Sequence, residues 1–289
     1  MVPSVRSTAP LTREFRDWLE RRLGGALDLP LLPEVASRVV AMCDDENAEA
    51  RDVKRALEDD PSLASNFLRV ANSALYAARE PVVSLQQAIH RLGLRTTRTI
   101  ALTASLRARV FHVPGQPEHE ERVRAIWQHS VVAATFAREV ARTLRSSVEG
   151  AFLCALLHDV GRPIVLQAAL AAPDSVAPKP LAPEVLDAAM DEFHAAVGGR
   201  ALQAWKLADW TVAAVLHHHR PALAAPFEDE ARLVRLADLL SHWAISGDAR
   251  VDDFPMSDPV IEELDLYRED VEALLAMRGA VLEKVKTMP

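Results

Sequence analysis

The chain has 289 residues, enough for one large domain or two smaller ones with hydrophobic cores of their own. Hydrophobic residues make up 49% of the sequence, which excludes an intrinsically disordered protein. The formal net charge is −8, from 33 Lys and Arg against 41 Asp and Glu. Nonspecific nucleic-acid binding needs clustered cations, so nucleic acid is not an expected partner.

Two features bear on where the protein resides. Its two cysteines, Cys43 and Cys154, cannot staple a fold of this size, so a reducing compartment is the simpler interpretation. No uninterrupted apolar run reaches the roughly 20 residues that span a bilayer, and residues 1–10 lack the apolar stretch of a signal peptide. We therefore predict a cytoplasmic protein without a membrane partner.

Apolar residues recur at helical spacing, whereas runs of alternating Val, Ile and Thr are nearly absent, and this pattern predicts an all-α protein. Proline and capping residues mark the helix starts in chain order. One helix is predicted to begin near Glu34, after the Leu29–Pro33 segment. Another follows Asp60-Pro61, and a third follows Ser84, with Gln87 in the capping-box position.

The polar and charged segment Val113–Glu121 is predicted to separate two helical lobes, one over residues 12–115 and one over residues 120–289. The second lobe is expected to be a helical bundle. It contains seven of the ten histidines, and for this reason it is the expected place for chemistry.

Later segments complete the predicted organisation. Residues 172–183 and 248–259 predict exposed loops, because proline and polar residues gather there. The amphipathic stretch Leu264–Val285 is expected to pack on the second lobe. A dimer seam is the alternative for this stretch, so a homo-oligomer stays open.

Histidine and aspartate residues of the second lobe follow a pattern typical of metal sites. His158-Asp159 ends an apolar helix, and neighbouring helix residues differ by about 100° in direction, so both can address one site. Imidazole and carboxylate together suit Mn, Fe, Zn or Ni, in a mononuclear or binuclear centre. The predicted metal ligands are His129, His158, Asp159, His194, His218, His219 and Asp238. The alternative is a relic site whose polar groups hydrogen-bond one another.

The order His129, His158-Asp159, Asp238 resembles the H…HD…D signature of the HD superfamily of metal-dependent phosphohydrolases. The additional histidines resemble those of its binuclear HD-GYP phosphodiesterases. The surrounding segments resemble the HDOD family, whose domain is an HD-related output domain. These segments are Leu29–Pro33, Asp59–Leu63, Leu68–Ser73, Ser84–Gly93, His194 with Gly198 and Trp205, and His218–Pro221. The resemblance covers about residues 25–240.

The resemblance implies a signal-transduction module that binds a partner protein or a nucleotide second messenger. A metal-dependent phosphohydrolase or nucleotide phosphodiesterase is the alternative, in which metal ions activate water for attack on phosphorus. Asp159, Arg162 and Lys206 are the candidate catalytic residues of that alternative, with Arg162 or Lys206 holding the phosphate. For Lys206 a solvated surface is the competing interpretation.

Two departures from the HD-GYP pattern argue against hydrolysis of a cyclic dinucleotide. The segment Arg220–Pro226 follows the paired histidines without the Gly-Tyr-Pro element of that family. Arg162 stands where a lysine is common, and its planar fork differs from a point charge. Enzymatic activity therefore stays open.

Other residues have structural explanations. Cys154 is expected to be a buried thiol, and Trp205 and Trp210 are expected to be core anchors. The arginines of residues 91–109 are expected to form a solvated surface.

Overall fold

The computed structural model describes residues 11–24, 34–45, 47–76, 81–112, 116–247 and 249–286. Within these ranges the regular secondary structure is helical, without strands, and the prediction of an all-α protein is confirmed. The Leu29–Pro33 segment lies outside the described residues, as do residues 113–115 of the predicted boundary.

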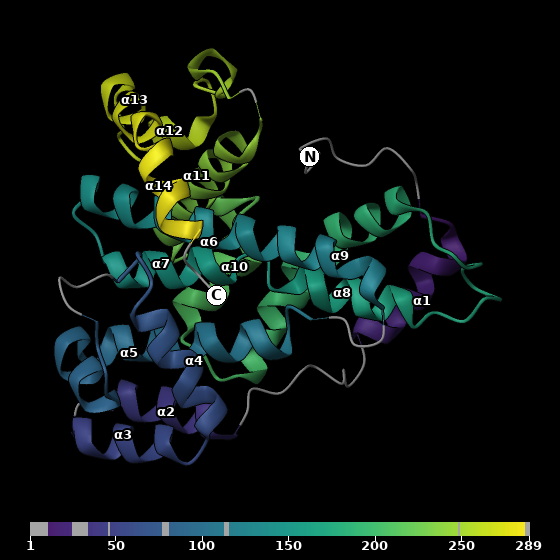
Figure 1. The fold of residues 1–289 in the computed structure, drawn as a ribbon. Coiled ribbons are helices and arrows are strands. Elements are labelled where there is room, and N and C mark those ends of the chain that lie inside the picture. Colours follow the sequence, from purple (N-terminus) through teal and green to yellow (C-terminus); the bar gives the residue numbers. More distant parts are fainter. Residues whose placement is uncertain are drawn as a thin grey trace.

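Four helices form the first lobe, at the lower left of Figure 1. They are α2 (Glu34–Asp44), α3 (Ala50–Glu58), α4 (Pro61–Ala71) and the first part of α5 (Leu85–Arg109). Their apolar faces meet in one core, in which Val53, Leu57 and Phe67 are fully buried.

Local signals set the helix starts of this lobe as predicted. The Asp60 carboxylate accepts from the backbone N–H of Leu63 at 3.0 Å and caps α4. The Ser84 hydroxyl caps α5 by accepting from the N–H of Gln87 at 3.2 Å. The Gln87 side chain accepts from the N–H of Val83 rather than from that of Ser84, so only half of the predicted capping box forms.

The second lobe is built around α6, which runs through its centre and is buried along most of its length. Some of its other helices pack directly on α6, and the rest pack on one another, as Figure 1 shows. In chain order the elements are η1 (Pro117–His119), α6 (Glu120–Thr143), α7 (Val148–Leu157), α8 (Gly161–Leu170), α9 (Pro183–Ala204), α10 (Asp209–His217), η2 (Pro221–Leu223) and α11 (Glu228–Ile245).

Helix α1 (Arg13–Gly24) does not join the first lobe, to which the predicted boundary assigned it. It contacts α8, and its Phe15 and Leu19 are buried in the core of the second lobe. Arg16 on its surface forms an ion pair with Glu192 of α9, with 2.7 Å between Nε and Oε1. The sequence between α1 and α2 thus links two different cores.

The C-terminal segment forms η3 (Val251–Asp253), α12 (Pro259–Glu263), α13 (Arg268–Ala276) and α14 (Arg278–Lys286). Helices α13 and α14 pack on α6, so the amphipathic stretch Leu264–Val285 does lie on the second lobe, as two helices rather than one. Residues 172–182 are free of helix, in agreement with the predicted loop.

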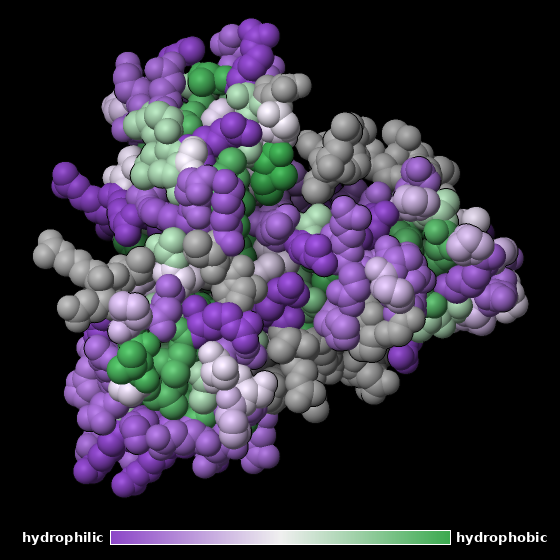
Figure 2. All heavy atoms as spheres, viewed as in Figure 1, coloured by the Kyte–Doolittle hydropathy of each residue, from purple (hydrophilic) through white to green (hydrophobic). Residues whose placement is uncertain are grey.

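Among the described residues, one long apolar segment is Val148–Leu170, which comprises α7 and α8. By length and composition alone this segment is sufficient to cross a membrane, although Glu149, Asp159 and Arg162 interrupt it, so no uninterrupted apolar run of that length occurs in it. However, 83% of its most apolar window is buried inside the protein, as in a core helix. Hydrophilic residues predominate on the face shown in Figure 2, where apolar residues form separate patches.

Candidate metal centre

All seven predicted ligands come together in the second lobe, from five separate segments. His129 projects from α6, His194 from α9 and Asp238 from α11. His158-Asp159 occupies the turn between α7 and α8, and His218-His219 follows α10 directly. Six of the seven are buried, whereas His219 is exposed and marks the open side of the cluster.

One group of ligand atoms surrounds the Nε2 atom of His129. Nε2 of His158 lies 3.2 Å from it, Oδ1 of Asp238 lies 3.0 Å away, and Oδ2 of Asp159 lies 3.6 Å away. Nε2 of His158 is itself 3.5 Å from the same oxygen of Asp238. Two imidazoles and two carboxylates therefore converge on a space of atomic size.

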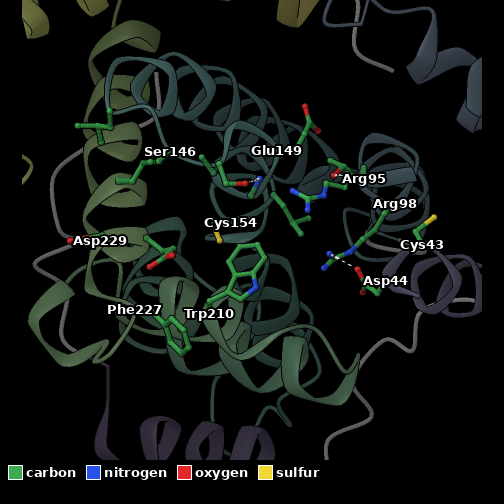
Figure 3. A pocket seen from close by; sticks show the side chains of 18 of the residues that line it. Cys43, Asp44, Arg95, Arg98, Ser146, Glu149, Cys154, Trp210, Phe227 and Asp229 are labelled. Atoms are coloured by element: carbon green, nitrogen blue, oxygen red, sulfur yellow. Dashed lines mark hydrogen bonds and ion pairs between the residues drawn. The ribbon is translucent and has the colours of Figure 1, made fainter. Parts of the chain in front are cut away.

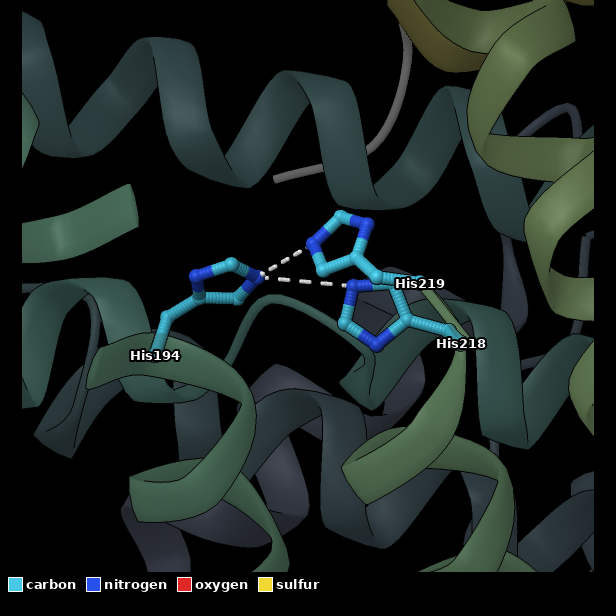
Figure 4. Close-up of side chains that lie close together, drawn as sticks. All are labelled: His194, His218 and His219. Carbon is cyan, nitrogen blue, oxygen red and sulfur yellow. Dashed lines mark hydrogen bonds between the residues drawn. The ribbon is translucent and has the colours of Figure 1, made fainter. Parts of the chain in front are cut away.

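A second group surrounds the Nε2 atom of His194, as Figure 4 shows. Nε2 of His219 lies 3.0 Å from it and Nε2 of His218 lies 3.4 Å from it. Oδ1 of Asp159 lies 3.4 Å from the same nitrogen. Asp159 thus presents one oxygen to each group, the position that a carboxylate bridging two metal ions requires.

Backbone carbonyls fix the tautomer of three of these rings. Nδ1 of His158 lies 2.6 Å from the Ala155 carbonyl, and Nδ1 of His218 lies 2.7 Å from the Val215 carbonyl. Nδ1 of His194 lies 2.8 Å from a carbonyl of α9. A carbonyl only accepts, so each Nδ1 donates its proton there and, in the neutral ring, Nε2 is left with a free lone pair.

Lone pairs that face one another at 3.4 Å, as those of His194 and His218 do, repel unless a cation lies between them. This donor set, with neutral imidazoles held by carbonyls and carboxylates alongside, is the one that divalent transition metals prefer. The residues present therefore fit a metal ion of this class.

The pKa values of the rings follow from burial and from the carboxylates. Burial lowers the pKa of His129 to about 4 and that of His194 to about 3, so both are neutral at pH 7. Burial alone would also lower the pKa of His158, but Asp159 and Asp238 outweigh it and raise that pKa to about 9. In the absence of metal, the proton of His158 supplies the positive charge of the first group.

Gly161 allows this geometry by bringing the start of α8 against α9. A Cβ atom at this position would lie 2.0 Å from the carbonyl oxygen of His194 and 2.8 Å from the backbone nitrogen of Gly198. Any side chain here would therefore push α9, and His194 with it, away from Asp159.

Arg162 faces the cluster from α8, but its guanidinium is already occupied. Its Nε donates to Oδ2 of Asp159 at 2.8 Å, and its Nη1 donates to Oδ1 of Asp191 at 2.8 Å. In this arrangement Arg162 positions Asp159 and takes one lone pair of the oxygen that faces the first group. The predicted contact between Arg162 and a phosphate stays a prediction.

Lys206 does not join the cluster in this structure. It follows the C-terminus of α9 and is exposed. Twelve residues separate it from His194, which corresponds to about 18 Å along a helix. The geometry gives no support to its predicted role.

His242 was not among the predicted ligands. Its Nε2 lies 3.3 Å from Oδ1 of Asp238, and these two residues with His129 form a third group of close ligand atoms. The signal was present in the sequence, because residues four apart lie on one face of a helix. Ser241 adds an orienting contact, with its hydroxyl 2.9 Å from Nδ1 of His129.

The fold and the site thus define an all-helical protein with a buried cluster of histidine and aspartate. Comparison with known proteins identifies its relatives. The HDOD domain matches residues 29–221. A provisionally named metal-dependent phosphohydrolase from Shewanella amazonensis SB2B superposes with a TM-score of 0.72 over 94% of this chain and 99% of its own, at 20% identity. A provisionally named signal transduction protein from Marinobacter aquaeolei VT8 gives a TM-score of 0.65 over 95% of this chain and 65% of its own, at 23% identity.

The chain belongs to the HDOD family, as its motifs predicted. The structural relatives establish the shared fold. An uncharacterised protein from Treponema pallidum (strain Nichols) is 21% identical over 238 residues, and this chain spans 45% of the length of that relative.

Proposed function

We propose that this protein is an HDOD-type signal-transduction module whose second lobe binds one or two divalent transition-metal ions, of Mn, Fe, Zn or Ni. The observation that carries the proposal is the gathering of imidazole nitrogens and carboxylate oxygens from five segments into two groups, each of which includes one oxygen of Asp159. The expected partner is a nucleotide second messenger or a signalling protein.

The chain supports this function by holding its donor atoms in place before any ion arrives. His129, His158, Asp159 and Asp238 would hold a first metal ion, while His194, His218 and His219 would hold a second with Asp159 between them. His242 is a further candidate for the first. A bound metal ion would supply positive charge for a phosphate oxygen at the open side of the cluster, beside His219.

The test is the metal content of the purified protein, measured by elemental analysis after incubation with each metal and removal of the excess. We expect one or two equivalents for the unmodified chain and less than about a tenth of that for Asp159→Ala, because both groups lose an oxygen. His217→Ala is the matched control, since His217 neighbours the cluster in sequence but belongs to none of the ligand groups. Full metal content in Asp159→Ala would contradict the ligand assignment.

Phosphohydrolase activity is the second candidate, favoured by the position of Asp159 between two sets of histidines. Arg162 argues against it, because two of its N–H groups are engaged by Asp159 and Asp191 and not directed at a phosphate. A panel of nucleotides and cyclic dinucleotides, incubated with the metal-loaded protein, separates the two functions. Binding without turnover supports the signalling module, whereas turnover that Asp159→Ala abolishes and His217→Ala retains establishes the hydrolase.

A further inference from the structure

A cavity of about 880 Å³ lies between the two lobes, away from the metal centre. None of the candidate metal ligands lines it. One wall comes from α2 and α5 of the first lobe, and the other comes from α7, α10, α11 and the end of α12. Figure 3 shows this inter-lobe cleft. Its volume is within the range of sites for small organic ligands.

The first-lobe wall presents two arginines. Arg98 uses its Nη1 to donate to Asp44 at 2.8 Å, but its Nε and Nη2 atoms are buried and have no hydrogen-bond partner. Arg95, on the same face of α5, is exposed, and no described residue pairs with it in an ion pair. Buried donors of a charged group are costly to leave unpaired, so an anion at this wall would remove a penalty.

The opposite wall is acidic. Arg138 pairs with Oε1 of Glu149 at 3.2 Å, and the other oxygen of Glu149 is buried without a hydrogen-bond partner. Glu230 and Asp265 stand on the same wall, and neither has an ion pair with a described residue. Asp229 and Glu263 also line it, although both pair with Arg232.

Two aromatic side chains lie between these walls. Trp210 of α10 stands near the centre of the cleft in Figure 3, and Phe227 lies beside it toward the acidic wall. An indole face next to carboxylates is a favourable place for an organic cation, which gains from the ring quadrupole and from the charges together.

The balance of charge decides between ligand classes. Seven carboxylates and two guanidiniums line the cleft, namely Asp44, Asp45, Glu149, Asp229, Glu230, Glu263 and Asp265 against Arg95 and Arg98. A ligand that carries only negative charge, such as a mononucleotide, would meet a net negative lining. On the first-lobe wall Asp44 and Asp45 balance Arg95 and Arg98, and the donors open to an anion are Arg95 and the Arg98 atoms that Asp44 leaves unpaired. A ligand with a charge of each sign can use these donors at one end and the acidic wall at the other.

We propose that the inter-lobe cleft binds a small zwitterionic organic molecule. Its carboxylate or phosphate lies against Arg95 and Arg98, and its ammonium or guanidinium group lies against Glu230 and Trp210. The site is separate from the metal centre, so the metal content of the protein does not decide this proposal.

The test is calorimetric titration of the full chain in the presence of a chelator. The probes are L-arginine, 6-aminohexanoate and phosphocholine, with acetate, methylammonium and guanosine monophosphate for comparison. At least one zwitterion is expected to bind with a Kd of about 1 mM or less, and the three comparison compounds are expected to bind at least about tenfold more weakly. No binding of any zwitterion up to about 10 mM, or tighter binding of guanosine monophosphate, would overturn the proposal.

Substitutions on the two walls test whether the zwitterion binds in the cleft. Arg98→Gln and Glu230→Gln are each expected to weaken the zwitterion at least about tenfold, because each leaves one end of the ligand unpaired. Arg55→Gln and Glu262→Gln do not touch the cleft and should bind as the unmodified chain does. Circular dichroism and the Tm confirm that each variant is folded. Unchanged zwitterion binding in Arg98→Gln or in Glu230→Gln would also overturn the proposal.

Discussion

Buried histidines make the metal-free protein sensitive to acid. Burial holds the pKa of His129 at about 4 and that of His194 at about 3, and it lowers the pKa of His218 well below its ordinary value. In the unfolded chain these rings take up protons near pH 6.5, so the unfolded state binds more protons below that pH. His158 acts in the opposite direction, because its folded pKa of about 9 gives stability that is lost as the pH rises through 9.

His219 adds to the lowered set and His242 to the raised one. We therefore expect the Tm of the chelated protein to fall as the pH is lowered from about 7 to about 5, since four rings with a lowered pKa outweigh two with a raised pKa. Thermal denaturation in a chelating buffer at several pH values measures the change. His194→Gln removes one of the four rings with a lowered pKa and should make the dependence shallower. A Tm that stays constant or rises over this interval would contradict the burial of these rings in neutral form.

The sequence alone was a better guide to the candidate ligands than to the side chains that contact them. The ligand pattern selected His129, His158-Asp159 and Asp238, which lie together in the structure, because the family motif records residue types. It did not give the ion pair of Arg162 with Asp191, because that contact depends on how α8 packs on α9. Lys206 was grouped with the site by charge alone, and charge does not fix a distance.

At the scale of the elements, the contact between α8 and α9 controls the position of His194. Gly161→Ala is expected to lower the free energy of unfolding by about 1–3 kcal/mol or more, because the added Cβ overlaps the backbone of α9. Metal content should fall with it, because His194 moves away from Asp159. Urea denaturation and elemental analysis measure the two effects.

Gly279→Ala is the control for this substitution. A Cβ at Gly279 of α14 meets no atom within 4 Å, so the alanine should be neutral or stabilising by up to about 1 kcal/mol. Equal losses in the two variants would show that the α8–α9 contact is not the cause.

Helix starts were predictable because their causes are local. Asp60-Pro61 and Ser84 each satisfy backbone N–H groups within three residues, so the sequence is sufficient to find them. The break of Leu264–Val285 into α13 and α14 was not predictable, because an amphipathic pattern continues across it.

At the scale of the whole molecule, the packing of α1 can be tested with two matched leucines. Leu19 of α1 and Leu57 of α3 are both fully buried, but in different cores. Leu19→Ala and Leu57→Ala should each lower stability by about 2–5 kcal/mol. Hydrogen exchange should become faster in α8 for the first variant and in α4 and α5 for the second. Faster exchange of the first lobe in Leu19→Ala would contradict the assignment of α1.

The predicted boundary between residues 115 and 120 separates the lobes only in part. Periodicity finds α1 as an amphipathic helix but does not say which apolar surface covers it. Leu102 and Leu106 of α5 likewise belong to the larger core, so the part of α5 that follows the break at Gly93 contributes to both lobes. Contacts of this kind join residues that are distant in the chain, and they become visible in the structure.

The route of the chain, from α1 on the second lobe to the first lobe and back again, makes the second lobe a discontinuous folding unit. A protease that nicks the backbone near Pro117 would sever the covalent link without releasing either fragment, because the N-terminal fragment remains anchored through Phe15 and Leu19. Conversely, a recombinant piece that starts at residue 120 would expose the groove that α1 covers on α8 and would be expected to aggregate.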